Sequence, residues 1–198
     1  MALTLNKATL AREQRRLATF QRFLPALDLK RRQLLAARAE VKRAIATTQA
    51  RRRAVTQRVA EDLPMVADKR LDLEHLVTLE TVTLGTENVV GVSLPTLEDV
   101  ELTAAPYAYL ARPHWVDALV ARLREAITLG VQEDLERQRL ERLEAAVRIV
   151  TQRVNLFDKV LIPRTRGHIR RLQIHLGDAQ RAAVVRAKFA KTRSRAHR

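Results

Sequence analysis

Histidines are the residues in this sequence best suited to metal or acid–base chemistry, and they stand at positions 75, 114, 168, 175 and 197. Only His168 and His175 are close in the chain, and their spacing of seven residues places them on one face of a helix. A protein metal site takes three or more ligands, and no third histidine or carboxylate is obvious beside this pair. The pattern favours two partly exposed histidines over a metal centre.

Adjacent carboxylates could act as a general acid and base, and two such pairs are Glu61–Asp62 and Glu133–Asp134. Both lie in helix-like stretches without signs of a cleft, so we expect solvated helix faces or helix caps. A phosphate-binding loop needs clustered glycines followed by Lys and then Ser or Thr, whereas the five glycines here are isolated and Gly167 precedes His168. The sequence therefore predicts a non-catalytic protein without a metal ion or cofactor.

The composition is typical of long helices or a coiled coil. The 198 residues are 46% hydrophobic, only 4% aromatic and 30% charged, with no cysteine. The lack of cysteine excludes a disulfide framework and a thiolate zinc site. No apolar run approaches the ~18 residues of a membrane span, and the N-terminus lacks the apolar core of a signal peptide. We expect a soluble intracellular protein without direct membrane insertion.

The net charge of +15 is unevenly distributed. Residues 1–60 contain 15 Lys and Arg against 3 Asp and Glu, residues 61–112 contain 3 against 10, and residues 113–198 contain 19 against 9. Two basic arms therefore flank an acidic middle. The arms fit a solvated coiled-coil face, an acidic protein partner or nucleic acid. No aromatic stacking platform or recognition module supports the nucleic-acid interpretation.

The first arm, residues 1–62, has a heptad repeat. Its apolar residues recur on two registers three residues apart, which is the a/d spacing of a coiled coil. Arg31, Arg38, Thr48 and Arg52 interrupt the repeat, and an arginine can lay its stem on a seam with its head in water. Asn6 is expected to cap the helix N-terminus. The seam residues assigned to this arm are Leu17, Leu24, Leu27, Leu34 and Val41.

The second arm, residues 113–190, begins near Pro113, which suits the first turn of a helix. Its apolar positions alternate steps of three and four, then slip in phase after Leu161, where a step of four leads to Thr165. Such a stutter locally unwinds a supercoil. Because Pro163 lies in the slip, we expect a bend or a loosened turn within residues 157–169. The seam residues of this arm are Leu140, Leu143, Val147, Val150, Val154, Phe157 and Leu161.

The middle segment, residues 63–112, is richer in proline and in β-branched residues. The stretch "VTLETVTLGTENVVGVSLP" predicts two short strands joined near "GTEN", a small β-hairpin. A short helix is expected around Met65 to Leu76. Residues 191–198 are expected to form a basic tail.

Two heptad arms joined by a compact insert predict an all-α fold, a long antiparallel two-helix coiled coil with the insert at its loop end. We paired the arms so that the numbers of facing residues add to about 188. This pairing places Pro25 opposite Pro163 and predicts one shared bend. A charge placed at Val147 or Val154 is expected to unzip the seam, whereas a charge at Arg139 is expected to be silent.

The run "RVNLFDKVLIPRTRGHIRRLQIHLGDAQRAAVVRAKFAKTR" resembles the D subunit of V-type (vacuolar/archaeal-type) rotary ATPases. "LNKATLAREQRRLATFQRFLPALDLKRRQLL" looks like the bacterial branch of that family, and "NVVGVSLP" at 88–95 looks like its mid-chain segment. Gly167 and Gly177 depart from the expectation of a straight last helix. The most distinctive residues of the resemblance are Arg153, Val154, Asn155, Ile162, Pro163 and Arg164.

The resemblance implies a non-catalytic rotor shaft in the central stalk, which couples ion translocation to ATP synthesis or hydrolysis. Its paired N- and C-terminal ends would enter the hexamer of catalytic and regulatory subunits, where the nucleotides bind. The small F subunit of the stalk would bind its side, and its loop end would sit in a funnel-shaped subunit above the membrane ring. The complex would lie at the cytoplasmic face of the plasma membrane. A basic coiled-coil nucleic-acid-binding protein or a helical adaptor is the alternative.

Overall fold

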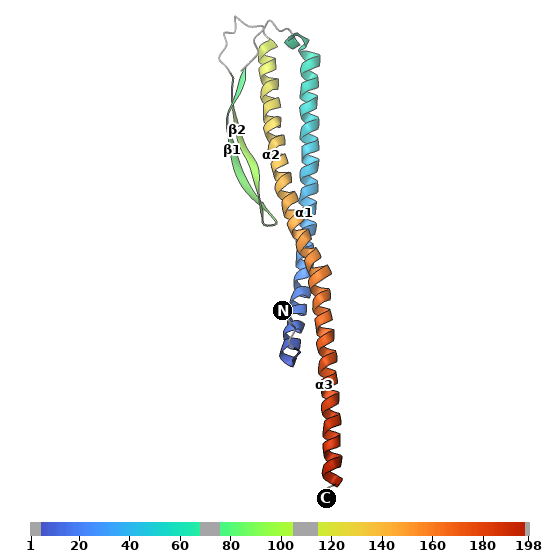
Figure 1. Ribbon diagram of the computed structural model, residues 1–198. Coiled ribbons are helices and arrows are strands. Elements are labelled where there is room, and N and C mark those ends of the chain that lie inside the picture. The colour runs from blue at the N-terminus through green and yellow to red at the C-terminus, as the bar shows by residue number, and fades with distance from the viewer. Residues whose placement is uncertain (1–4, 68–75, 105–114, 197–198) are drawn as a thin grey trace. The chain divides into compact units, whose positions relative to one another are not determined.

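A computed structural model describes residues 5–67, 76–104 and 115–196 (Figure 1). The chain divides into two compact units. The terminal unit contains Met1–Arg31 and Ile149–Arg198, and the central unit contains Arg32–Arg148. Pro113 and most of the short helix expected around residues 65–76 lie outside the described residues.

Helix α1, Lys7–Asp62, and helix α2, Trp115–Asn155, each contribute residues to both units. The expected cap at Asn6 is confirmed, because its Oδ1 accepts a hydrogen bond from the Thr9 N–H at 2.7 Å. This bond satisfies one of the backbone donors left open in the first turn. Pro25 lies inside α1, which continues as one helix on both sides of it.

In the central unit, α1 and α2 form an antiparallel pair with a β-hairpin beside α2 (Figure 1). Cross-helix contacts join Thr48 to Glu136 and Lys42 to Glu144. These pairs lie four and two residues from the predicted pairing. The fold class is confirmed as a helical hairpin with a small β insert.

The hairpin consists of β1, Val77–Val89, and β2, Val92–Ala104, paired antiparallel. The strands are longer than expected, and the turn lies at Val90–Gly91, so its predicted position near "GTEN" is wrong. Val90 has φ 55° and Gly91 has φ 78°, which are the signs that a two-residue turn matching the strand twist requires. The Gly91 N–H also donates to Asn88 Oδ1 at 2.8 Å.

A small apolar core closes the loop end of the central unit. Its buried residues are Leu63, Leu76, Val116, Leu119 and Val120. They come from the residue that follows α1, from the start of α2 and from the residue that precedes β1. The short 3₁₀ helix η1, Pro64–Ala67, follows Leu63. This core therefore fixes the base of the hairpin relative to the helix pair.

In the terminal unit, the first part of α1 packs antiparallel to η2, Leu156–Leu161, and to the start of α3, Ile162–Ala196. The rings of Phe20 and Phe157 meet edge to face at 5.4 Å, whereas the predicted pairing placed Phe20 opposite His168. The predicted pairing is wrong in this unit. Five residues beyond Phe20, Pro25 lies level with residues near 152 and not with Pro163. The expected bend shared by the two prolines is thus not supported.

The helix loosens before Pro163, as the phase slip predicted. Residues Leu156–Leu161 form the π-helix η2, and α3, Ile162–Ala196, follows without a gap. The Ile162 N–H donates to the Phe157 carbonyl, five residues back. Three successive seam steps of four, from Phe157 to Ile169, contain one residue more than a heptad alternation, and a π-turn accommodates one additional residue. Pro163 then falls in the first turn of α3.

Candidate functional site

Every residue assigned to the apolar seam is buried or half-buried. In the central unit, Leu34 and Leu143 are 0% exposed, and Val41 and Val147 are also buried. In the terminal unit, Val150 and Val154 are buried, and the half-buried residues include Leu17, Leu24, Leu27, Phe157 and Leu161. Among the distinctive residues, Val154 and Ile162 are buried, whereas Arg153, Asn155, Pro163 and Arg164 are exposed.

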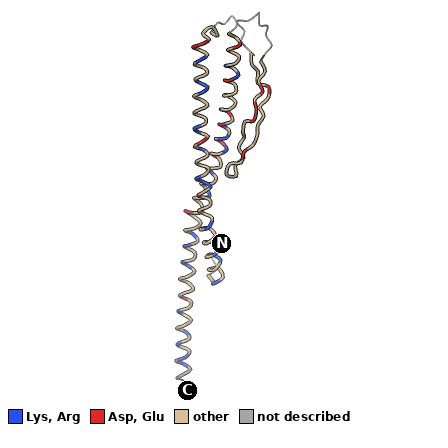
Figure 2. The backbone as a smooth tube through the Cα atoms, turned by 180° about the vertical axis from the view of Figure 1, so that it is seen from behind, with Lys and Arg blue, Asp and Glu red and all other residues tan. Residues whose placement is uncertain are grey.

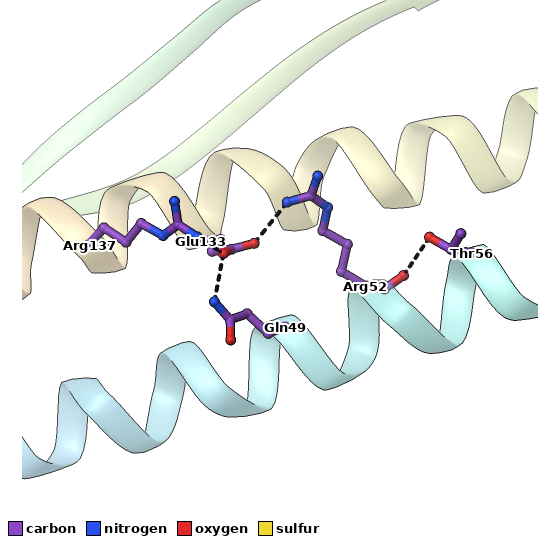
Figure 3. A network of polar contacts seen from close by, with 5 residues as sticks. All are labelled: Gln49, Arg52, Thr56, Glu133 and Arg137. Carbon is purple, nitrogen blue, oxygen red and sulfur yellow. Dashed lines mark hydrogen bonds and ion pairs between the residues drawn. The ribbon is translucent and has the colours of Figure 1, made fainter.

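Polar side chains interrupt this seam in the central unit, where Thr48 and Glu133 are each 3% exposed and Glu136 is 9% exposed. Gln49 Nε2 and Arg52 Nη1 on α1 each donate to the Glu133 carboxylate at 2.9 Å (Figure 3). Thr48 Oγ1 donates to Glu136 Oε1 at 3.1 Å. We call these five residues, Thr48, Gln49, Arg52, Glu133 and Glu136, the polar layer.

Side chains of α2 itself add hydrogen bonds to the polar layer. Arg137, one turn beyond Glu133, donates to the Glu133 carboxylate (Figure 3). Gln132 Nε2 donates to Glu136 Oε1 at 3.1 Å. The hydrogen bonds from Gln49 and Arg52 hold the pKa of Glu133 below its ordinary value, and the charge of Arg137 adds to the effect. Glu133 is therefore a carboxylate at neutral pH.

The expectation that Glu133 lies on a solvated helix face is wrong, although Asp134, Glu61 and Asp62 are exposed. The sequence did contain a signal for the polar layer. Glu133 and Glu136 continue the three–four alternation of α2 backward from Leu140, so both carboxylates occupy seam positions. The interruptions at Thr48 and Arg52 on the first arm are their partners.

Two arginines of α2 hold the turn end of the hairpin. Arg139 Nη2 pairs with Glu87 Oε2 at 2.9 Å, and its Nη1 donates to the Pro95 carbonyl at 3.4 Å. Arg142 Nη1 donates to the Ser93 carbonyl at 3.2 Å. A substitution at Arg139 is therefore not expected to be silent, contrary to the sequence-based expectation. Its side chain is only 23% exposed and joins α2 to both strands.

The hairpin carries charge of one sign. Strands β1 and β2 contain Glu80, Glu87, Glu98, Asp99 and Glu101 and no Lys or Arg, which Figure 2 shows as red without blue along both strands. Behind it, a groove of about 490 Å³ is lined by Leu97 of β2 together with residues of α1 and α2. Its walls include Val41, Ala44 and Leu135, so the strand pair covers an apolar part of the helix pair.

In the terminal unit, a buried carboxylate of α1 meets a histidine of α3. Glu13 is 4% exposed, and its Oε2 lies 3.5 Å from His168 Nδ1, while its Oε1 accepts from Arg16 at 3.0 Å. His175 is exposed, and the other three histidines lie outside the described residues. Within residues 5–67, 76–104 and 115–196, no group of three or more metal-ligating side chains comes together.

One face of α3 exposes large apolar side chains. Ile174, Val185 and Phe189 recur at steps of eleven and four, which keeps them on one side of a helix, and each is about half or more exposed, with Phe189 at 70%. Figure 1 shows this part of α3 running beyond the N-terminal end of α1 within the terminal unit. In the described parts of the chain, no helix has the length and apolarity to cross a membrane.

Comparison with known proteins assigns the chain to a family across nearly all of its length. A family model for the D subunit of ATP synthase matches residues 9–192. The D subunit of the V-type ATP synthase of Borreliella burgdorferi is 30% identical over 190 residues, which cover 96% of this chain and 94% of that protein. The protein of the same name from Chlamydia muridarum is 31% identical over 201 residues, covering 99% and 98%. The one from Chlamydia felis is 33% identical over 197 residues, covering 96% and 92%.

Proposed function

The chain belongs to the D-subunit family of ATP synthases, and from this membership we propose that it is the rotor shaft that couples the membrane ring to the catalytic hexamer of a V-type ATP synthase. It is a non-catalytic component of the central stalk. The observation that carries the proposal is the match over residues 9–192, which spans both helical arms and the hairpin. Rotation of this shaft would link ion translocation to ATP synthesis or hydrolysis.

The helix pair of the central unit suits a mechanical part. Torque passes along two helices only if neither slides nor separates, and the buried seam and the polar layer oppose both motions. A shaft turning inside a sleeve also needs contacts that are weak and replaceable. The many exposed Arg and Lys residues on α1 and α3 suit contacts of that kind.

Partners are proposed at three places. The exposed apolar face of α3, Ile174, Val185 and Phe189, supports docking of this end inside the hexamer of catalytic and regulatory subunits. The loop end of the helix pair would sit in the funnel-shaped subunit above the membrane ring, and the small F subunit of the stalk would bind the side of the helix pair. The assembly would lie at the inner face of the plasma membrane.

Affinity purification of the tagged chain from its own cells tests the proposal. The catalytic ATPase subunits and a small stalk partner are the expected companions. Phe189→Asp should reduce recovery of the catalytic subunits at least tenfold, because the carboxylate would be desolvated in the sleeve. Ala187→Asp adds the same charge about 200° around the same helix and should leave recovery within twofold.

Two outcomes of this purification would contradict the proposal. One is recovery of the chain without ATPase subunits. The other is recovery of DNA or RNA that is lost steeply as salt is raised, as expected for the nucleic-acid alternative. Equal recovery of the catalytic subunits with Phe189→Asp and Ala187→Asp would show that the α3 face is not the docking surface. It would not contradict the assignment of the chain as the shaft.

A further inference from the structure

The apolar seam does not by itself select one pairing of α1 with α2. Heptad repeats bring apolar residues back into register whenever one helix slides by seven residues, about 10 Å along the axis. In the native pairing, Leu143 lies level with Val41. A slide in one direction would bring it level with Leu34, which is equally apolar. Something other than apolar burial must therefore oppose such a slide in the central unit.

The polar layer distinguishes the native pairing from both slipped pairings. In the structure, Thr48 lies level with Glu136 and donates to it. A slide by seven residues in one direction would place Glu136 level with Val41, and a slide in the other would place it level with Val55. Both valines are buried, so Glu136 would lose its donor on α1, keep only Gln132 of its own helix and remain in an apolar seam.

Glu133 reinforces the same selection. Gln49 and Arg52 supply donors to it from α1 at 2.9 Å each, and a slide by seven residues would separate the carboxylate from both. In one direction Lys42 and Ile45 would take their places, and in the other Thr56 and Val59 would. We propose that the polar layer is a register lock, which keeps α1 from sliding along α2 because a slide by one heptad in either direction sets the buried Glu136 against a valine and takes Arg52 away from Glu133.

The register lock is expected to lower the stability of the fold relative to an apolar layer, and this difference makes it testable. Buried charged groups contribute less to stability than apolar residues of similar size, so an apolar layer is expected to be as stable or more stable. Among the described residues, Glu136 Oε2 also has no hydrogen-bond partner although it is buried. The layer is therefore built for a specific pairing and not for the greatest stability. This inference concerns the two helices of the chain itself, and it goes beyond the proposed function because it holds whichever complex the chain serves.

Cross-linking of the full-length chain tests the lock, and the sequence has no native cysteine to interfere. Lys42→Cys with Glu144→Cys reports the native pairing, because these side chains meet at 3.2 Å. Leu35→Cys with Glu144→Cys reports a slide by seven residues in one direction, and Lys42→Cys with Thr151→Cys reports the other. A short bis-thiol reagent is applied to each pair, in the native background and in Thr48→Val/Glu133→Leu/Glu136→Leu.

In the native background, the native pair should react at least tenfold more than either slipped pair. In the apolar-layer variant, at least one slipped pair should rise about tenfold while the melting temperature stays equal or increases. An unchanged cross-linking pattern in that variant would overturn the proposal at any melting temperature. Leu143→Ala is the matched control for general weakening, and it should lower the melting temperature without admitting a slipped pair. Glu133→Gln keeps an acceptor for Gln49 and should retain the native pattern.

Discussion

Removing the side chain of Leu143 measures how much stability the seam supplies. This leucine is 0% exposed on α2 in the central unit. Leu143→Ala deletes buried apolar surface and leaves a cavity that the helices can only partly close, so we expect a loss of about 3 kcal/mol in the free energy of unfolding. For a chain of this length each kcal/mol corresponds to about 2–4 °C. The melting temperature should therefore fall by roughly 6–12 °C.

Far-ultraviolet circular dichroism of the purified chain measures this change, and Leu156→Ala is its control. Leu156 is the same residue type on the same continuous helical stretch, but it is 46% exposed. Its truncation removes less burial and leaves no closed cavity, so about 1 kcal/mol or less is expected. Equal losses for the two variants would refute the reasoning, because they would show that burial on the seam does not set the stability.

Four further perturbations test other features of the molecule. Val147→Asp should cost about 3–5 kcal/mol by chemical denaturation, whereas Gln138→Asp at an exposed position should stay within about 0.5 kcal/mol. Arg139→Ala should speed proteolytic cleavage at the hairpin turn severalfold, because two bonds to the strands are lost. Glu133 has a lower pKa in the folded than in the unfolded chain, so it stabilises the fold above its ordinary pKa of 4.5, and this stabilisation is lost as the pH falls through the lowered value. In thermal melts, Glu133→Gln should therefore lose less stability than the native chain over that pH range. Gly177→Ala should raise stability by about 0.4–1 kcal/mol in the same melts, because an added Cβ would meet nothing within 4 Å.

The periodicity of the sequence was sufficient to predict the helices and the loosened turn before Pro163, and the residues that it assigned to the seam are buried or half-buried. Each of these depends on local spacing, and spacing is visible in one chain. The pairing of the arms was not predictable in this way, because apolar heptads align almost equally well at several offsets. The offset chosen to match the apolar runs therefore failed at Phe20, whose neighbour is Phe157.

The position of the hairpin turn and the polar layer were missed for different reasons. The turn was placed near Gly85 because glycine is a turn signal, but Gly85 serves a crowded cross-strand position, where a Cβ would lie 2.2 Å from a Glu98 oxygen. The turn itself uses Val90, a β-branched residue that rarely adopts positive φ. The charge of Glu133 by itself predicts a solvated position, and only its partners on the other arm make its burial tolerable.

The π-turn at Leu156–Leu161 determines the rotational setting of everything that follows it. One inserted residue turns a helix by about 100°, so η2 fixes which face of α3 each side chain joins. If the same residues of η2 formed regular α-helix instead, Ile174, Val185 and Phe189 would swing about a quarter-turn around the axis together, because the wide π-turn absorbs the rotation of one residue. The composition of that face would be unchanged, yet it would point elsewhere. The segment η2 therefore sets the rotational position of α3 about its own axis.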